Sequence, residues 1–150
     1  MSRSLLLASQ SETRQRLLRN AEVSFDSLPA QIDEDGLRNA MLAEGATPRD
    51  IADGLADMKA RKMAARYSGR LILGCDQVLA FQEQVFRKPE NRDAARAGLL
   101  QLRGGTHELL SAAVIYEDGA PVWRHIGAVR LTMRNFSDSY LEAYLNRNWP

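Results

Sequence analysis

The sequence has very few residues that bind metals through sulfur or nitrogen, and it has no long apolar run. Its one cysteine, Cys75, excludes an internal disulfide framework, and its two histidines lie too far from any cysteine cluster to form a zinc site. No apolar stretch approaches the roughly 18 residues that cross a membrane, and Leu5 to Ala8 is shorter than the seven or more of a secretory signal. We therefore expect a cytoplasmic chain with no membrane partner.

Charge of one sign is also missing, because 20 Lys and Arg residues face 19 Asp and Glu residues, for a net charge of +1. This balance excludes a globally basic protein that binds nucleic acid polymers. The chain has no glycine-rich phosphate loop ending in Gly-Lys-Ser/Thr and no Gly-x-Ser-x-Gly, so a P-loop enzyme and a serine hydrolase are both unsupported. With 150 residues, 45% of them hydrophobic, residues 1–150 fit one compact domain.

What the chain does contain is an alternation of short apolar runs with amphipathic segments. This pattern predicts an α/β fold with a mixed sheet flanked by helices. The expected strands are 5–8, 23–26, 71–73, a hairpin of 78–81 with 85–86, a second hairpin of 109–116 with the run from 122, and 129–133. The expected helices begin at about Glu12, Leu37, Pro48, Asn91 and just after Ser137.

The first candidate site is the expected strand-to-helix turn Ser9-Gln10-Ser11-Glu12-Thr13-Arg14. Free backbone N–H groups and the positive end of a helix dipole favour a phosphate at such a turn. Two hydroxyls and a guanidinium add donors suited to phosphate oxygens. An ordinary helix N-cap with Arg14 in solvent explains the same residues, and the hexapeptide by itself favours that alternative.

The second candidate is Asp76, which we place at the carboxyl end of the strand Leu71-Ile72-Leu73. Ligands bind beyond that end of the strands in open α/β sheets, and a carboxylate there can hold a divalent cation or activate a water. A turn-starting Asp that caps backbone amides is the alternative. Cys75 beside it is either a nucleophile paired with a histidine or, as we expect, a buried and inert thiol.

Three further segments carry charge. Asp33-Glu34-Asp35 forms an acidic run in an expected irregular loop, where solvated carboxylates are more common than a metal site. Lys59 lies one helical turn from both Leu55 and Met63, so its stem borders the buried face, as in a surface lysine that snorkels to solvent. Pro89 restricts Lys88 to extended conformations, which would aim its ammonium consistently, although the motif by itself favours an ordinary loop lysine.

Taken in order, these segments resemble the Maf family of nucleoside triphosphate pyrophosphatases, also called septum-formation-inhibitor-like proteins. The resemblance runs from about residue 5 to 146 and is specific as an ordered set. It rests on Leu5-Leu-Leu-Ala-Ser-Gln-Ser-x-x-Arg14-x-x-Leu-Leu18, Asp33-Glu34, Lys59-Ala60, Gly74-Cys-Asp76-Gln77-Val78, Lys88-Pro89 and Leu102-Arg-Gly-Gly-Thr-His107. It implies a two-lobed α/β fold with a cleft, hydrolysis of nucleoside triphosphates to monophosphate and pyrophosphate, a divalent cation (Mg or Mn), and homodimers.

Carried over by position, the resemblance makes Asp76 the proton acceptor and a metal-associated carboxylate, with Glu34 as the second acidic group at the metal. The triphosphate would be surrounded by Ser9, Ser11, Arg14, Lys59 and Lys88. Phosphoanhydride hydrolysis needs cations at the non-bridging oxygens and a base that orients a water, so these residue types suit the reaction.

This sequence departs from the family pattern in three ways, two of which concern the choice of nucleobase and one the C-terminal part of the fold. Thr13 stands where an arginine is commonest and Gln77 where a threonine is commonest, and both positions are associated with base choice in the family. Both changes indicate the branch that acts on 7-methyl-GTP rather than dTTP and UTP. The family also continues past Pro150 with further strands, so we expect an exposed sheet edge or a changed topology. The alternative function is a nucleotide-binding or interaction module that keeps the site without turning substrate over.

Overall fold

The computed structural model describes residues 3–149, which form six strands and five helices. In chain order these are β1 (Leu5–Ala8), α1 (Glu12–Asn20), β2 (Phe25–Leu28), α2 (Glu34–Ala43), α3 (Pro48–Arg66), β3 (Leu71–Phe81), β4 (Gln84–Phe86), α4 (Arg92–Leu102), β5 (Thr106–Glu117), β6 (Ala120–Thr132) and α5 (Asp138–Asn148). No helix within this part of the chain is long and apolar enough to cross a membrane.

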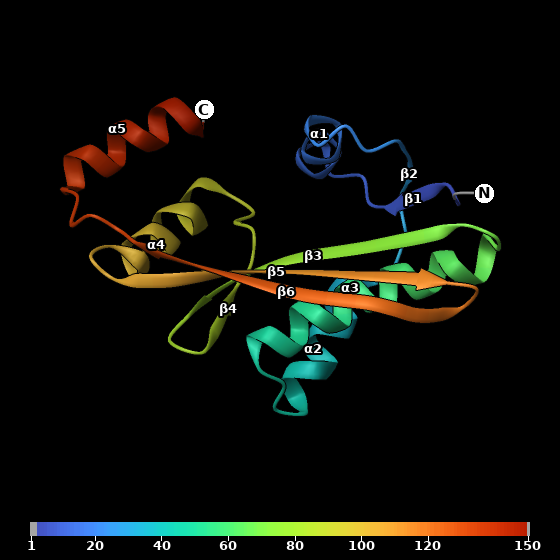
Figure 1. The fold of residues 1–150 in the computed structure, drawn as a ribbon. Helices are drawn as coiled ribbons and strands as arrows, with labels where there is room; N and C mark the ends of the chain where they lie inside the picture. Colours follow the sequence, from blue (N-terminus) through green and yellow to red (C-terminus); the bar gives the residue numbers. More distant parts are fainter. Residues whose placement is uncertain (1–2, 150) are drawn as a thin grey trace.

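The strands form one mixed sheet in the order β2-β1-β3-β5-β6, with β4 paired to β3 (Figure 1). β2, β1 and β3 are parallel, whereas β5 and β6 are antiparallel to their neighbours. The expected α/β fold with a mixed sheet is confirmed. Within residues 3–149, β6 has no strand on its outer side and is an edge of the sheet.

β3 is longer than the sequence pattern predicts, and this corrects the position of Asp76. The strand does not end at residues 74–76 but runs on to Phe81, because β5 pairs with it from Leu71 (opposite Glu117) to Ala80 (opposite Glu108). Asp76 therefore lies in the middle of a strand and not at its carboxyl end. A long antiparallel partner keeps the backbone extended through polar residues that look like a turn in the sequence.

The other side of β3 is only partly paired. β1 pairs with residues 71–73 and β4 with residues 79–81, so residues 74–78 have no strand beside them on this side. The sheet therefore has a gap next to Asp76, directly beyond the carboxyl end of β1. The rule that ligands bind at strand ends in α/β sheets applies here to β1 rather than to β3.

α3 covers the sheet opposite α1 (Figure 1), and the main core lies between α3 and strands β3 and β5. Gly74 allows a short distance between α3 and β3. A Cβ on it would lie 2.1 Å from the carbonyl oxygen of Ala56 and 2.8 Å from the amide nitrogen of Ala60. The helix backbone can approach β3 only where the strand has no side chain. That close approach brings Lys59 of α3 next to Asp76 of β3.

We predict that Gly74→Ala destabilises the fold by about 1–3 kcal/mol, the usual cost of adding atoms to a packed interior. The free energy of unfolding in urea measures this effect. Gly98→Ala is the matched control, since a Cβ there meets nothing within 4 Å and alanine is preferred inside a helix such as α4. Equal stability of the Gly74→Ala variant and the wild type would contradict the close-approach explanation.

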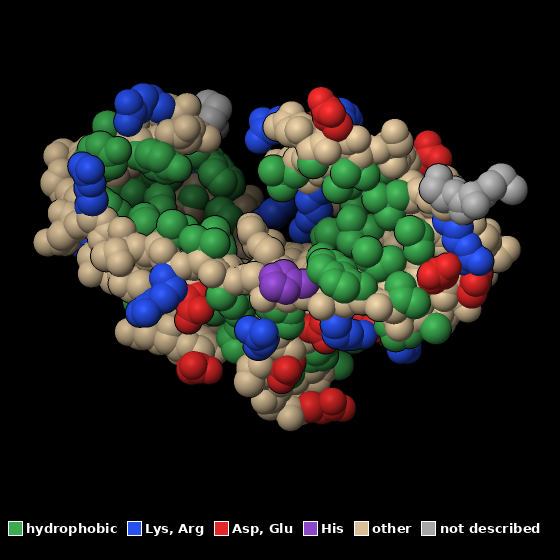
Figure 2. Space-filling model, in the orientation of Figure 1, with side chains coloured by type: hydrophobic (Ala, Val, Ile, Leu, Met, Phe, Trp, Pro, Cys, Tyr) green, Lys and Arg blue, Asp and Glu red, His purple; other side chains and the backbone are tan. Residues whose placement is uncertain are grey.

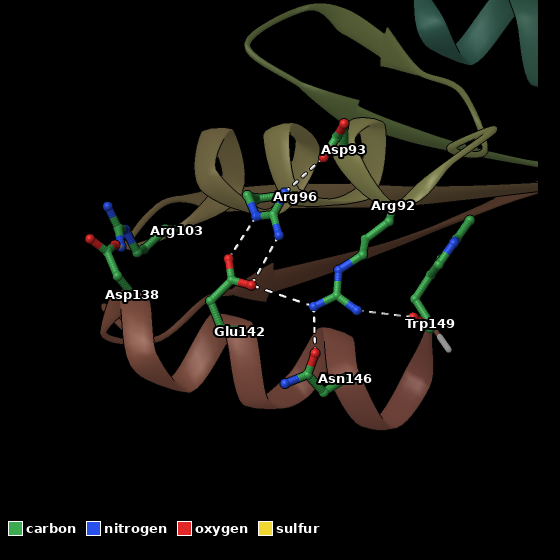
Figure 3. Close-up of polar contacts among 8 residues, drawn as sticks. All are labelled: Arg92, Asp93, Arg96, Arg103, Asp138, Glu142, Asn146 and Trp149. Carbon is green, nitrogen blue, oxygen red and sulfur yellow. Dashed lines mark hydrogen bonds and ion pairs between the residues drawn. The ribbon is translucent and has the colours of Figure 1, made fainter.

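α4 and α5 pack together beyond the end of the long β5–β6 hairpin and form, with β4, a second lobe (Figure 1). Their small core contains Ala95, Leu141 and Leu145. Glu142 accepts hydrogen bonds from Arg96 at 2.7 and 2.9 Å and from Arg92 at 3.4 Å (Figure 3). These bonds, above all those of Arg96, lower the pKa of Glu142. The second lobe is thus held by polar contacts as well as by its core.

The helices begin at or within one residue of the predicted positions, except for α2. Ser11 caps α1, Thr47 caps α3 with a proline at the first helical position, and Ser137 caps α5, so these three helices begin where the sequence predicts. The acidic run is not an irregular loop, because Asp33 accepts from the backbone N–H of Gly36 and α2 begins at Glu34. Carboxylates near a helix N-terminus interact favourably with the helix dipole, which explains the earlier start.

Candidate active site

A cleft of about 930 Å³ lies at the gap beside β3 and collects side chains from distant parts of the chain. Figure 2 shows a hollow between the two halves of the molecule, with Lys and Arg side chains inside it. Seven of the residues proposed from the sequence line this cleft: Ser9, Ser11, Arg14, Glu34, Lys59, Asp76 and Lys88. The specificity candidate Gln77 lines it as well.

Lys59 connects two carboxylates at the centre of the cleft. Its Nζ lies 3.2 Å from Oδ1 of Asp76 and 2.5 Å from Oε1 of Glu34, and it also donates to the carbonyl oxygen of Cys75 at 3.3 Å. Lys59 and Asp76 are each only 8% exposed. Lys59 is therefore a buried cation shared by α2 and β3, which corrects the interpretation of a snorkelling surface lysine.

The pKa of Asp76 is shifted by its surroundings in the cleft. Burial raises its pKa above the ordinary value of 3.8, and the ammonium of Lys59 opposes this shift without cancelling it. Its Oδ1 is bonded to Lys59, whereas its Oδ2 is buried and has no hydrogen-bond partner among the described residues. A buried oxygen without a hydrogen-bond partner is costly, so Oδ2 is an unsatisfied acceptor at the cleft.

The turn between β1 and α1 contains the N-cap of α1, Ser11, and it also places Ser9, Ser11 and Arg14 along the cleft, as expected of an anion site. Ser9 Oγ accepts from the backbone N–H of Ser11 at 3.0 Å and from the guanidinium of Arg14 at 3.2 Å. Ser11 Oγ accepts from the backbone N–H of Arg14 at 3.3 Å. Arg14 is half-buried and lines the cleft, so it is not a solvated surface arginine.

Two arginines of the cleft were not found from the sequence. Arg38 lies on α2 four residues after Glu34, and Arg87 immediately precedes Lys88 in the loop after β4. A helix starting at Glu34 places residues 34 and 38 on one face, so the correct helix start would have revealed Arg38. Lys88 itself is exposed and makes no ion pair with another residue of the described range.

Thr13, the other specificity candidate, lies outside the cleft. It is exposed on the first turn of α1 and is not among the residues that line the cleft.

Cys75 is half-buried rather than fully buried, and burial raises the pKa of its thiol. A raised pKa leaves little thiolate at neutral pH, so Cys75 is not an activated nucleophile.

A second, mainly apolar cavity of about 1,110 Å³ adjoins the cleft and was also missed from the sequence. Its walls include β3, the β4 hairpin, α4 and α5, and hydrophobic side chains line the left part of the hollow in Figure 2. The two cavities share Gln77, Phe86, Arg87, Lys88 and Glu90. Together they form a polar space and an apolar space side by side.

The donors of the polar cleft suit a divalent cation. Five carboxylates and five cationic side chains line it, so a polyanionic ligand needs additional positive charge. Asp76 and Glu34 supply the carboxylate oxygens that Mg²⁺ and Mn²⁺ prefer, and Oδ2 of Asp76 has no other partner in the described structure. The described residues contain no group of three or more metal-ligating side chains. Mg²⁺ commonly binds through one or two carboxylates plus substrate phosphates, so this set fits.

Comparison with known proteins places the chain among nucleotide-hydrolysing enzymes. A nucleoside triphosphate pyrophosphatase of Ruegeria pomeroyi is 55% identical, over 97% of this chain and 73% of that protein. A 7-methyl-GTP pyrophosphatase of Brucella abortus is 38% identical, over 98% of this chain and 74% of that protein. The crystal structure of a dITP/XTP pyrophosphatase from Mycobacterium abscessus shares the fold, with a TM-score of 0.53 at 17% identity over 89% of this chain and 75% of that one.

The resemblance seen in the motifs extends over nearly the whole sequence. The family model described as Maf-like protein matches residues 4–150, a range that includes every residue of the polar cleft. The order of motifs, the shared cleft and the mixed sheet agree with this match. The chain therefore belongs to the Maf family.

Proposed function

We propose that this chain is a nucleoside triphosphate pyrophosphatase that releases pyrophosphate and a nucleoside monophosphate. The observation that carries the proposal is the pairing, in one cleft, of a cluster of cations with a buried carboxylate oxygen of Asp76 that has no hydrogen-bond partner within residues 3–149. Relatives at 55%, 53% and 52% identity are named nucleoside triphosphate pyrophosphatases. Phosphoryl transfer requires this combination of a base and positive charge.

In this proposal the triphosphate occupies the polar cleft. Arg14, Lys59 and Lys88 neutralise its non-bridging oxygens, and the hydroxyls of Ser9 and Ser11 and the free N–H groups at the start of α1 donate to the same oxygens. The nucleoside occupies the adjoining apolar cavity. The α-phosphorus then lies near Asp76, at the boundary between the two cavities.

Asp76 acts as the general base. Its carboxylate takes a proton from a water molecule as the water oxygen attacks the α-phosphorus, and the bond from that phosphorus to the bridging oxygen breaks. Pyrophosphate leaves with the electron pair of that bond. Lys59 holds Oδ1 of Asp76 in an ion pair, which leaves Oδ2, without a hydrogen-bond partner among the described residues, as the proton acceptor in this proposal.

A divalent cation, Mg or Mn, would be held by Asp76 and Glu34, and it would supply charge neutralisation on the phosphate oxygens. Glu34 is then the second acidic group, presented by the first residue of α2. The shared contact with the ammonium of Lys59 supports this role only by bringing the carboxylates of Glu34 and Asp76 close to each other.

The preferred substrate in this proposal is a modified guanine nucleotide such as 7-methyl-GTP. Gln77 lines both cavities and would contact the base, and the name of the relative from Brucella abortus agrees with this substrate. Thr13 remains a proposed specificity residue through its position in the motif alone. The family resemblance also supports a homodimer and a cytoplasmic location, and light scattering of the purified protein tests the dimer.

A product assay tests the proposed function. The protein is incubated with Mg²⁺ and GTP, 7-methyl-GTP, ATP, UTP, CTP or dTTP, and monophosphate, pyrophosphate and inorganic phosphate are separated. We expect equal amounts of monophosphate and pyrophosphate, with the fastest turnover for 7-methyl-GTP. Inorganic phosphate as the product would show cleavage at another bond. Saturable nucleotide binding without any product would favour a binding module in place of an enzyme.

A further inference from the structure

Arg38 of α2 is a cation of the polar cleft that lies outside the motifs resembling the Maf family. It follows Glu34 by four residues, so the two side chains share one face of the helix. Glu34 contacts Lys59 at the centre of the cleft, and Arg38 lines the same cleft one helical turn further on. The helix that presents the proposed metal-binding carboxylate therefore presents a guanidinium as well.

The side chain of Arg38 is largely buried although its ion-pair partner is not. Its exposed fraction is 16%, against 74% for the side chain of Asp35. Within residues 3–149 the guanidinium makes one hydrogen bond, from Nη1 to Oδ1 of Asp35 at 2.7 Å. A guanidinium has five N–H donors, so most of the donors of Arg38 have no protein partner in this range. Arg38 is thus held in the wall of the cleft by more than a surface ion pair.

The two cavities place Arg38 away from the nucleoside of a bound nucleotide. Arg38 lines the polar cleft alone, whereas Arg87 and Lys88 line both cavities. In the proposed function the nucleoside fills the apolar cavity, and the α-phosphorus lies at the boundary between the two. The β- and γ-phosphates then extend into the polar cleft, where Arg38 is. These two phosphates become the pyrophosphate.

We propose that Arg38 is a further catalytic residue, which binds the β- and γ-phosphates and stabilises the pyrophosphate as it leaves. This inference rests on the proposed function and deepens it. The pyrophosphate takes the electron pair of the broken P–O bond, so it gains negative charge in the transition state. A guanidinium keeps its charge at every working pH and can bond two phosphate oxygens at once, which suits it to this role.

Arg38→Met separates binding of the leaving group from binding of the nucleoside. Calorimetry in the presence of Mg²⁺ measures the Kd of pyrophosphate and the Kd of 7-methyl-GMP. We expect the Kd of pyrophosphate to rise about tenfold, since a hydrogen bond to a charged group contributes that much, while the Kd of 7-methyl-GMP stays unchanged. The value of kcat/KM for 7-methyl-GTP should fall about 100-fold, with a smaller loss in Arg38→Lys, which keeps the charge without the two-point contact.

A variant of Asp35 distinguishes this role from a structural one. Asp35→Asn weakens the same ion pair, but it keeps the guanidinium and removes a carboxylate from the wall of the cleft. We therefore expect Asp35→Asn to bind pyrophosphate more tightly than the wild type does. If the pair served only to hold α2 together, both variants would shift binding in the same direction. Arg19→Met is the matched control and should bind as the wild type does, because it removes a helical arginine paired with Glu12 outside both cavities.

The results that would overturn the inference differ from those that would refute the proposed function. An unchanged Kd of pyrophosphate in Arg38→Met, weaker binding in Asp35→Asn, or a wild type that does not bind pyrophosphate would each overturn the role of Arg38. A wild type that binds pyrophosphate but hydrolyses no nucleotide would instead refute the proposed function.

Discussion

Replacing Asp76 with asparagine is expected to lower kcat about 1,000-fold, within the range usual for loss of a general base. An amide has nearly the size of a carboxylate and still accepts a hydrogen bond from Lys59, so the cleft keeps its shape. It does not take up a proton from water and is a poor ligand for a divalent cation. Steady-state pyrophosphate release measures the effect.

The same substitution is expected to raise the melting temperature of the metal-free protein at neutral pH. Burial raises the folded-state pKa of Asp76 above its unfolded value, so its stabilising contribution is present at low pH and is lost as the pH rises through the folded pKa. At pH 7 the ionised carboxylate therefore destabilises the fold, whereas asparagine does not. For a chain of this size each kcal/mol recovered corresponds to about 2–4 °C.

Asp118→Asn is the matched control for the Asp76 variant. Asp118 lies in the turn between β5 and β6 and pairs with Arg3, far along the chain from every residue of the cleft. Its variant should retain full activity and should not gain stability. If Asp76→Asn hydrolyses nucleotides at the wild-type rate, Asp76 is not the base.

The second large effect is expected for Lys59→Met. Methionine has a similar length but no charge, so the variant loses a cation at the triphosphate and leaves Asp76 and Glu34 without their shared partner. We expect kcat/KM to fall at least about 100-fold, since charge-stabilising groups in active sites commonly contribute that much. We also expect the fold to lose stability as the pH rises through the pKa of Asp76, because burial raises that pKa and the variant removes the ammonium that opposes the shift.

A double variant separates the two consequences of losing Lys59. Lys59→Met combined with Asp76→Asn removes one of the two repelling carboxylates, so it should recover stability without recovering activity. Arg66→Met, which removes an exposed cation from the last turn of α3, is the control and should behave like the wild type. A Lys59→Met variant with normal kcat/KM would exclude Lys59 from the binding of the triphosphate.

Much of the fold follows from local sequence patterns. Ser11, Thr47 with Pro48, and Ser137 mark helix starts because their side chains accept hydrogen bonds from backbone N–H groups within the next turn. The alternation of strands and helices indicates an α/β fold. The cleft residues could be proposed because the motifs occur in the order typical of a known family, and each motif by itself has an ordinary structural explanation.

The features of the fold and the site that the sequence does not predict depend on contacts between segments far apart in the sequence. β3 continues through Asp76 because β5, some 35 residues away, pairs with it without interruption. Lys59 is buried because Gly74 allows α3 to approach β3 closely. The apolar cavity is built from β3, the β4 hairpin, α4 and α5, and no single segment has a pattern that predicts it.

The most direct test of the proposed reaction is the product assay carried out in water enriched in ¹⁸O. Attack of water on the α-phosphorus places one labelled oxygen in the nucleoside monophosphate and none in the pyrophosphate, and mass spectrometry of both products measures this. We expect that distribution in the wild type. Label in pyrophosphate or in inorganic phosphate would mean that water attacks another phosphorus, and the roles proposed for Asp76 and the surrounding cations would then be wrong.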